Sequence, residues 1–512
     1  IYTNEVLSRL YSTGKYELAE FASYAAIGDK RDNNIPWVFY PNSVNAKHND
    51  YKDYKSNSQN QFGRWRFERV CLDFKPDIVV DIRDPWMLMH LFESPLRPYY
   101  HLAVMPTVDS APQREEWVDS FMSADAVFGY TDWGLSVLNN QSNGMVKAQC
   151  PAYPGVNLDV FKPVKDKAQH RISKGIPPDA FIIGTVMRNQ KRKLYPDLFK
   201  AFRIFLDNAP KELADKTFLY IHSSYPDVGW DFANLIREEN LVNKIIFTYI
   251  CAETSKYYTA HFQDAKAYSP YSNAATGVLP SVSKGLTQEE MAEVFNLFDL
   301  YVQYSICEGF GMPQAEAAGC GIPIMAVNYS AMADVIKATK GFPIKVKTFF
   351  RELETDANRA YPDNEHCAEM FERFFNLTPE ERQKKGLKAR KTAEQKYNWD
   401  ITAQTWEEYF DNAVLTGRQG QWDAPYIHYD YPPDNHPPRL DNKEFLTWSY
   451  NNLLKEPEHL YSVFALKALR DLNYGVCKDA GILKPINQES LYKHFKQIVI
   501  NKILIEKVRT KM

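Results

Sequence analysis

Short apolar runs alternate with longer amphipathic stretches along most of this chain. Five runs rich in β-branched and aromatic residues are typical of buried strands, at 180–189, 218–224, 244–250, 299–305 and 322–327. Three similar runs come earlier, at 76–82, 101–109 and 124–131. Buried strands separated by helical patterns are typical of βαβ units. The pattern therefore predicts an α/β protein with parallel sheets.

Capping residues place some of the helices between these strands. Thr287 precedes an apolar stripe, and Glu290 follows it three positions later, which is the spacing of a capping box. Pro313 suits the first turn of a helix, and Gly321 suits the left-handed position after a helix end. We therefore expect one helix after Thr287 and a second, short helix over residues 313–320.

The residue pattern also predicts how the chain is divided. The stretches 124–131 and 298–305 are similar to each other, and we interpret them as equivalent strands of two α/β halves. The Pro- and Gly-rich segment 151–163 would be the hinge between them. We expect an N-terminal Rossmann-like domain, a C-terminal Rossmann-like domain, a further helix, a Pro-rich linker and a helical extension. Their predicted boundaries are 1–153, 154–395, 396–415, 416–441 and 442–512.

Composition and charge exclude few classes of protein. A net charge of −3 over 512 residues gives no global attraction to nucleic acid or acidic membranes. The segment 488–512 is basic, which is more often a solvated helix face than a nucleic-acid contact. Seven cysteines without a C-x-x-C pair favour reduced thiols in a cytoplasmic protein. We find no run of 18 apolar residues and no cluster with metal-ligand spacing, so we expect no transmembrane segment and no metal site.

The segment 305–327 carries the most informative chemistry. Glu308 lies in a glycine-containing loop directly after a predicted strand, and Glu316 lies one turn into the helix that follows. Glycines allow a ligand to approach the backbone closely, and the free N–H groups of a helix start attract an anion. One acid can therefore face a polar group near the anion, while the other binds hydroxyls about a nucleotide's width away. Ligands of open parallel sheets bind at this edge of the strands.

A basic loop follows the first strand of the second half. It contains Arg188, Lys191, Arg192 and Lys193. Cations at the carboxyl end of a strand are well placed to bind phosphates. Together with the acidic segment, this loop predicts a ligand with an anionic centre and a hydroxyl-rich end.

These motifs resemble those of a known family. The segment 308–316, "EGFGMPQAE", resembles the E-x7-E motif of retaining glycosyltransferases of family 4, whose GT-B fold has two Rossmann-like domains that face a cleft. Arg188 and Lys193 match the family's Arg-x4-Lys pair, and "PGVNLDVFKP" resembles its interdomain linker. The helix at 397–415 is similar to the last helix of the family, which crosses back to the N-terminal domain. The resemblance spans most of residues 60–415.

The resemblance implies roles for individual residues. Glu308 would contact the donor sugar, Glu316 the ribose hydroxyls, and Arg188 and Lys193 the donor diphosphate, although Lys191 or Arg192 could take the place of either cation. The backbone N–H groups of Gly309, Phe310, Gly311 and Met312 would assist. The donor would be a UDP-, GDP- or ADP-sugar, and the family generally uses no metal ion or other cofactor. Retention of the anomeric configuration would place the acceptor on the face of the leaving diphosphate.

Further polar residues are weaker candidates. Asp84 and Asp109 fall at strand ends and could face the acceptor, with loop capping as the alternative. His222 could line the donor pocket, whereas His101 is better explained by a structural role. Cys307 adjoins Glu308, but no histidine motif accompanies it, so we expect a packed thiol.

Three parts of the chain depart from the family pattern. The family's first strand and glycine-rich loop have no match before residue 30, so they either precede Ile1 or are absent. We expect the insertion at 251–284, which contains only Cys251 where some relatives carry paired cysteines, to be a metal-free loop. Residues 416–512 have no counterpart in a minimal family member.

The acceptor and the activity stay open. The chain resembles enzymes encoded by large tailed phages, which would imply a modified DNA base or a surface glycan as acceptor. One alternative is an inactive GT-B scaffold that binds a partner, which the intact acidic and basic motifs disfavour. Another is a hydrolase with paired carboxylates. We disfavour it because Glu308 and Glu316 would lie at opposite ends of the ligand.

Overall fold

The computed structural model describes residues 1–422, apart from 95, 273 and 282. These residues form two compact units. The first unit contains 1–16, 82–85 and 104–412, and the second contains 17–81, 86–103 and, of the described residues, 413–422. Most of the predicted Pro-rich linker and the whole helical extension predicted for 442–512 lie outside the described residues.

The second unit is built from short elements. Its strands β1 (Ala19–Ala26) and β2 (Val38–Ser43) pair in parallel, and Ala22, Ala25 and Phe39 form a small core beneath them. Its other elements are η1 (Lys30–Asn33), α2 (Tyr51–Lys55), η2 (Ser58–Phe62), α3 (Phe67–Phe74), β3 (Ile78–Asp81), α4 (Pro85–Glu93), η3 (Arg97–Tyr99) and β4 (His101–Val104), of which α4 and β4 reach into the first unit by one residue each.

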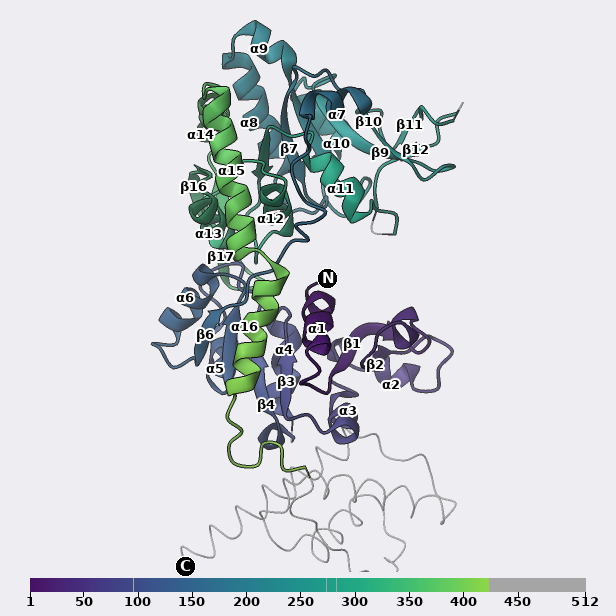
Figure 1. Cartoon of the computed structure of the whole chain (residues 1–512), viewed down its shortest axis with the longest axis vertical. Coiled ribbons are helices and arrows are strands. Elements are labelled where there is room, and N and C mark those ends of the chain that lie inside the picture. Colours follow the sequence, from purple (N-terminus) through teal and green to yellow (C-terminus); the bar gives the residue numbers. More distant parts are fainter. Residues whose placement is uncertain (95, 273, 282, 423–512) are drawn as a thin grey trace, which may run out of the picture. The chain divides into compact units, whose positions relative to one another are not determined.

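The main sheet of the first unit contains six parallel strands in the order β9-β8-β7-β13-β14-β15. Figure 1 labels β7 and β9 of this sheet. The bounds of the six strands are β7 (Phe181–Val186), β8 (Thr217–His222), β9 (Ile245–Cys251), β13 (Leu300–Gln303), β14 (Ile324–Val327) and β15 (Phe342–Ile344). This order is that of a doubly wound nucleotide-binding sheet, in which the winding direction reverses between the first and the fourth strand. The parallel strands predicted from the five apolar runs are thus confirmed.

Both faces of the sheet are covered because successive strand residues point to opposite sides. On β7, Phe181 and Ile183 enter one apolar core, whereas Ile182 and Val186 enter the other. The helices between the strands follow the 3.6-residue period, and the capping box of Thr287 and Glu290 is present at the start of α11. The helices are α8 (Tyr195–Asn208), α9 (Lys211–Lys216), α10 (Phe232–Glu238), α11 (Gln288–Phe295), α12 (Met312–Gly319), α13 (Ser330–Thr339), α14 (Asn364–Phe375) and α15 (Pro379–Lys396).

The insertion at 251–284 forms strands, although we expected a loop. Strand β10 (Tyr257–His261) pairs antiparallel with β9, and β11 (Lys266–Ala267) and β12 (Gly277–Val278) extend the same sheet. Along β10 burial decreases toward the end of the strand, because Tyr257 and Tyr258 are buried whereas His261 is exposed. We expected a loop because the pairing of these residues with β9 is not visible in the local residue pattern.

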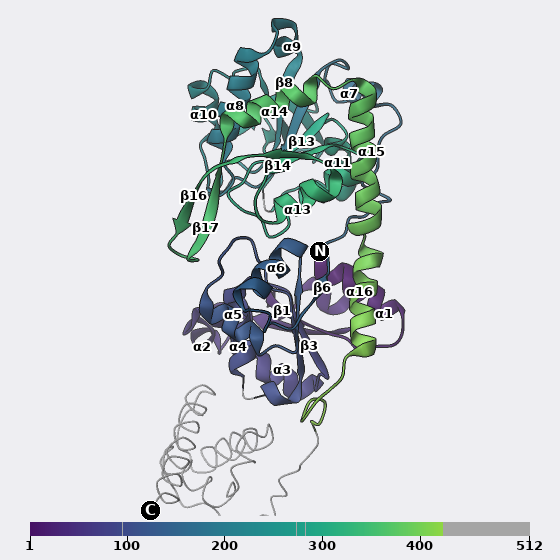
Figure 2. The same ribbon diagram turned by 90° about the vertical axis from the view of Figure 1, so that its left-hand side faces the viewer.

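The hairpin β16 (Val346–Glu352) and β17 (Ala357–Pro362) was also not predicted. Its two strands pair antiparallel, and Figure 2 shows them as a two-stranded ribbon separate from the main sheet. Strand β16, "VKTFFRE", contains three charged residues and has most of its side chains exposed, so it lacks the continuous apolar run by which the other strands were identified.

The first unit also contains the N-terminal residues 1–16 and extends to residue 412. Its remaining elements are α1 (Tyr2–Ser12), α5 (Glu115–Met122), β5 (Ala126–Gly129), α6 (Asp132–Gln141), β6 (Ala148–Pro151), α7 (Lys167–Ser173) and α16 (Trp399–Asn412). Strands β5 and β6 pair in parallel, and α1 packs against α16. The buried Trp406 of α16 lies with its ring centroid 4.2 Å from that of Phe128 and donates its indole N–H to the Tyr2 hydroxyl at 2.9 Å.

Two passages of the chain run side by side within the first unit. The N–H of Val156 donates to the carbonyl of Tyr397 at 2.9 Å, and the Thr402 hydroxyl donates to the carbonyl of Tyr153. A Cβ atom at Gly155 would lie 2.3 Å from the backbone nitrogen of Trp399. Glycine at position 155 is therefore required by the close approach of the second passage rather than by a turn.

Candidate functional site

Glu308 lies where the carboxyl end of β13 adjoins that of β7, which is the reversal point of the sheet. Only 5% of the residue is exposed. Its carboxylate contacts the ammonium group of Lys193, and it accepts from Arg192 Nη1 at 3.1 Å and from Gln303 Nε2 at 2.6 Å. Its backbone N–H donates to the Ser330 hydroxyl at 3.0 Å. Glu308 is thus a buried, oriented carboxylate with cations on both of its oxygens.

Lys193 is the buried cation of this cluster. The residue is 6% exposed, and burial together with the neighbouring Arg192 guanidinium lowers the pKa of Lys193 well below its usual range. The charges of Cys307 and Asp109 oppose this lowering. An isolated bridge between Lys193 and Ser305 connects the loop after β7 to the loop after β13, so the backbone fixes this pairing as well.

Arg188 is not part of this cluster. Its guanidinium forms two hydrogen bonds to Asp227, at 2.8 and 3.0 Å, and this contact holds the pKa of Asp227 well below its usual range. The side chain of Arg188 is about half exposed. Of the cations in the basic loop, the structure brings Arg192 and Lys193 to Glu308 and holds Arg188 at a separate loop.

The glycines of the loop "EGFG" have separate structural causes. A Cβ at Gly309 would lie 2.4 Å from Thr107 Cγ2, so a larger residue there would collide with the loop after β4. Gly311 has φ = +83°, a left-handed conformation that glycine adopts without strain, and it caps the start of α12. Gln314 of α12 donates its side-chain amide to the carbonyl of Phe310 at 3.0 Å, which fixes the loop against the helix.

Glu316 lies on α12, one turn after the loop. It is partly buried, and among the described residues its carboxylate has no hydrogen-bond partner. Burial raises the pKa of Glu316 to about 7. The carboxyl group is therefore available to a ligand, and hydrogen bonds from ligand hydroxyls would favour its ionised form.

His222 is the last residue of β8 and is held in place by neighbouring hydroxyls. Its Nδ1 lies 3.1 Å from the Thr248 hydroxyl, which in turn lies 2.9 Å from the Tyr220 hydroxyl. Burial lowers the pKa of His222 to about 4, so the imidazole is neutral at neutral pH. The structure thus gives His222 a hydrogen-bonding role within the sheet edge and no charge.

The two aspartates predicted to face the acceptor lie close to the basic loop. Asp84 hydrogen-bonds the Thr107 side chain, and burial raises its pKa, an effect that the charge of Asp109 increases and that of Arg192 opposes. Asp109 Oδ1 accepts from Arg359 Nη1 at 2.8 Å, and Asp109 Oδ2 accepts from the Cys307 thiol at 3.2 Å. Asp109 therefore connects to the residue directly before Glu308. Cys307 is 1% exposed, as expected for a packed thiol.

Sequence reasoning missed three residues of this cluster. Gln303 and Ser330 hold Glu308, and Arg359 holds Asp109. Gln303 carried a usable signal, since it is a polar residue inside an otherwise apolar strand. Ser330 adopts φ = +53° and Arg359 lies on the unpredicted hairpin, so neither shows itself in the residue pattern.

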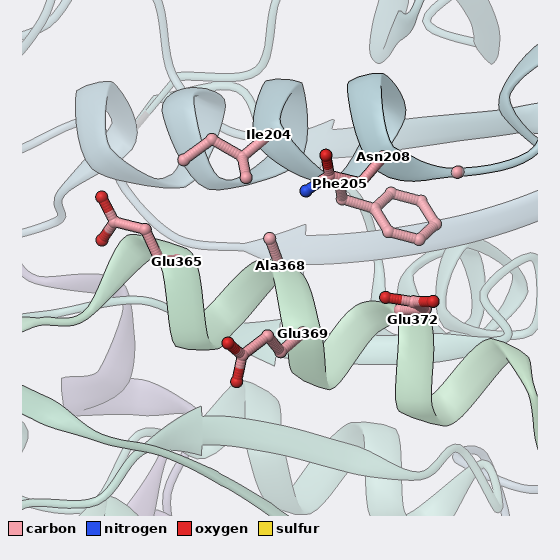
Figure 3. A pocket seen from close by; sticks show the side chains of 8 residues that line it. Ile204, Phe205, Asn208, Glu365, Ala368, Glu369 and Glu372 are labelled. Carbon is pink, nitrogen blue, oxygen red and sulfur yellow. The ribbon is translucent and has the colours of Figure 1, made fainter.

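A separate hollow lies between α8 and α14 (Figure 3). It is lined by Ile204, Phe205, Asn208, Ala209, Glu365, Ala368, Glu369 and Glu372. None of the candidate residues contributes to it, and the carboxylates on its α14 side offer nothing to a phosphate. We therefore place the candidate site at the strand edge and not in this hollow.

Comparison with solved structures defines the class of fold. Sucrose-phosphate synthase from Thermosynechococcus elongatus matches with a TM-score of 0.54 at 14% identity, over 80% of this chain and 90% of that one. A glycosyltransferase from Rickettsia africae matches with a TM-score of 0.55 at 15% identity, over 80% and 94%. HepE from Anabaena, solved in complex with UDP, matches with a TM-score of 0.51 at 13% identity, over 75% and 88%. The fold is of the GT-B type.

Sequence comparison points to particular proteins. Residues 281–373, which include Glu308 and Glu316 but not Lys193, match the family described as glycosyl transferases group 1. D-inositol 3-phosphate glycosyltransferase of Streptomyces scabiei is 24% identical over 270 residues, which is 52% of this chain and 49% of that protein. An enzyme of the same name from Catenulispora acidiphila is 25% identical over 214 residues, 42% of each chain. The chain thus spans about half the length of the curated relatives it matches or less.

None of the helices in the described part of the chain combines the length and the hydropathy needed to cross a bilayer.

Proposed function

We propose that this chain is a glycosyltransferase that moves a sugar from a nucleotide-sugar donor to an acceptor. The observation that carries the proposal is the buried Glu308 with Lys193 and Arg192 on its two oxygens, at the reversal point of a doubly wound sheet. The match of residues 281–373 to group 1 glycosyltransferases and the UDP complex of a protein with the same fold support it.

In the proposed reaction, positive charge stabilises the leaving diphosphate. Lys193 and Arg192 neutralise Glu308 in this structure, and they would turn to the diphosphate when a donor binds. The free N–H groups of Gly309, Phe310, Gly311 and Met312 at the start of α12 would add further positive potential. Because charge develops on the diphosphate as the sugar bond breaks, groups that are already in place lower the barrier to that step.

Two carboxylates would hold the sugars of the donor. Glu308, released from part of its contact with Lys193, would bind the transferred sugar, and Glu316 would accept hydrogen bonds from the ribose hydroxyls. Arg188 would join the diphosphate only after it leaves Asp227. His222 would donate or accept a hydrogen bond at the donor pocket as a neutral imidazole.

We propose retention of the anomeric configuration, as in the family 4 enzymes that the sequence resembles. The acceptor would attack from the face of the leaving diphosphate, which could take the acceptor's proton. Cations of the loop after β7 would supply the positive charge that a divalent metal would otherwise provide, so we propose a metal-independent reaction. We also propose that the reaction takes place in the cytoplasm. The acceptor would meet Asp84 and Asp109, and a surface glycan and a modified DNA base are the two candidates.

A nucleotide screen tests the proposal against the alternative of an inactive scaffold. We expect UDP, GDP or ADP to raise the thermal unfolding temperature of the wild-type chain, because a ligand that binds only the folded state stabilises it. Lys193→Ala should abolish the shift, whereas Lys200→Ala, which removes an exposed lysine of α8, should leave it unchanged. Lack of a shift with all three nucleotides would favour the scaffold.

The chemistry is tested separately with a panel of nucleotide sugars. We expect slow hydrolysis of one donor class to free sugar and nucleoside diphosphate, and we expect the rate to be insensitive to EDTA. The anomer released first reports on retention when the product is followed by NMR. Sugar released from a free glycan without any nucleotide would instead support the hydrolase alternative.

A further inference from the structure

Strand β17 joins the loop that carries Asp109 to the loop that carries Glu308. The N–H of Asn358 donates to the carbonyl of Ala111 at 3.0 Å, and the N–H of Ala360 donates to the carbonyl of Ile306 at 3.0 Å. Ala111 comes two residues after Asp109, and Ile306 two residues before Glu308. The residue between these two contacts is Arg359.

Arg359 is a buried cation shared by two carboxylates. Only 5% of the residue is exposed. Its Nη1 donates to Asp109 Oδ1 at 2.8 Å and contacts Cys307 Sγ at 2.8 Å, while Nε and Nη2 donate to Glu352 Oε2 at 2.9 and 2.5 Å. The planar fork of a guanidinium can serve two carboxylates and a sulfur in one plane, which a lysine ammonium cannot reproduce.

Asp109 is held at both oxygens and still reaches the surface. Oδ1 accepts from Arg359 and from the Ser110 hydroxyl at 2.8 Å, and Oδ2 accepts from the Cys307 thiol. Burial raises the pKa of Cys307, so its sulfur keeps the proton that it donates. The Asp109 side chain is 30% exposed, which leaves lone pairs available to a hydroxyl from outside.

We infer that Arg359 is a positioning residue for the acceptor step: through Asp109 it sets where an acceptor hydroxyl is held relative to Glu308. This inference rests on the proposed glycosyl transfer. It adds that acceptor binding, and not donor binding, depends on the hairpin β16–β17. An acceptor held by the Asp109 side chain would be a hydroxyl compound without a phosphate at this point, because carboxylates repel phosphates.

The first experiment needs no substrate. Arg359→Lys keeps the charge but loses the fork. Arg351→Lys on β16 is its matched control, because Arg351 is exposed and pairs with Asp356 at 2.8 Å. We expect alkylation of Cys307 by iodoacetamide, followed by peptide mass spectrometry, to become about ten-fold faster in the first variant as the loop opens locally. The control should label at the wild-type rate.

The second experiment separates donor from acceptor. UDP-glucose is supplied with and without methyl glucosides as acceptors, and transfer is measured against hydrolysis. We expect Arg359→Lys and Asp109→Asn each to raise the acceptor KM about ten-fold, which corresponds to one hydrogen bond to a charged group. In Arg359→Lys, the donor KM and the rate of donor hydrolysis should stay at the values of Arg351→Lys. If UDP-glucose is not turned over, the donor identified by the panel replaces it.

Three results would overturn the inference. Equal Cys307 labelling in the Arg359 and Arg351 variants would show that Arg359 does not hold the loop. Parallel losses in hydrolysis and transfer would show a general structural role instead of an acceptor role. If the wild-type chain turns over no nucleotide sugar at all, the proposed function fails and the acceptor role fails with it, while the labelling result still reports on the loop.

Discussion

At the scale of single residues, the acids were easier to find than their partners. Glu308 and Glu316 could be predicted because their spacing around a loop and a helix start is visible in the sequence. The cations that contact Glu308 could not be predicted. The conformation of the loop after β7 decides the partners of Arg188, Arg192 and Lys193, and the sequence does not show that conformation. The structure pairs Arg188 with Asp227 and directs the other two to Glu308.

Glu316 gives a prediction about pH. Its ordinary pKa of 4.5 is raised to about 7 by burial, so between these values the unfolded chain has released a proton that the folded chain retains. The free energy of unfolding should therefore fall as pH rises through this window and then stay level. We expect Glu316→Gln to remove this part of the pH dependence, as measured by urea unfolding across the window, whereas Glu238→Gln at an exposed position should retain it.

The same residue couples pH to nucleotide binding. Ribose hydroxyls donate hydrogen bonds, so they favour the ionised carboxylate, and nucleotide affinity measured by calorimetry should rise as pH passes about 7. In Glu316→Gln the affinity should be several-fold weaker at high pH, because a hydrogen bond to a charged group is worth about 1.5–3 kcal/mol. A pH-independent affinity in the wild-type chain would contradict the assignment to the ribose.

At the scale of elements, strand positions could be predicted closely and their edge partners could not. All five long apolar runs are strands of the main sheet, because burial on both faces leaves a continuous apolar signal. Strands β10 and β16 contain exposed or partly exposed positions and pair with a strand close in sequence, so they lack that signal. The same difference explains which site residues could be predicted. Glu308 follows a buried strand and was predicted, whereas Arg359 lies on an exposed hairpin and was not.

The contact between Gly309 and Thr107 can be tested as a pair. Gly309→Ala should destabilise the chain by about 1–3 kcal/mol in urea unfolding, because the added Cβ would lie 2.4 Å from Thr107 Cγ2. Thr107→Ser removes that methyl group, so the double variant should recover much of the loss, and the two changes should not be additive. Gly285→Ala, which has no atom within 4 Å of the new Cβ, serves as the control. Additive losses would show that this contact is not the cause.

At the scale of the whole molecule, contacts distant in sequence hold the first unit together. Tyr2 donates its hydroxyl to the carbonyl of Ala152 at 3.0 Å and accepts the indole N–H of Trp406. These pairings connect residues 150 and 404 positions apart, and no local pattern in the sequence predicts them. Only the resemblance to family 4 enzymes predicted that the helix over 397–415 crosses back to the N-terminal domain.

Trp406 allows this closure to be measured. Trp406→Ala removes a fully buried ring that packs on Phe128, so we expect a loss of about 3–5 kcal/mol in the free energy of unfolding. Trp406→Phe should keep part of the ring packing and lose the hydrogen bond to Tyr2, so its loss of stability should be smaller. Tyr268→Ala, at a residue that is 73% exposed, should change stability by less than about 0.5 kcal/mol.

The paired passages at 152–157 and 397–402 have a consequence for cleavage. A protease cut in the segment 157–166, which follows the first passage, would produce two fragments without a covalent bond between them. The two fragments would still be held together by the hydrogen bonds of Val156 with Tyr397 and of Tyr153 with Thr402. A nicked molecule should therefore elute from a sizing column as one particle and come apart only in denaturant.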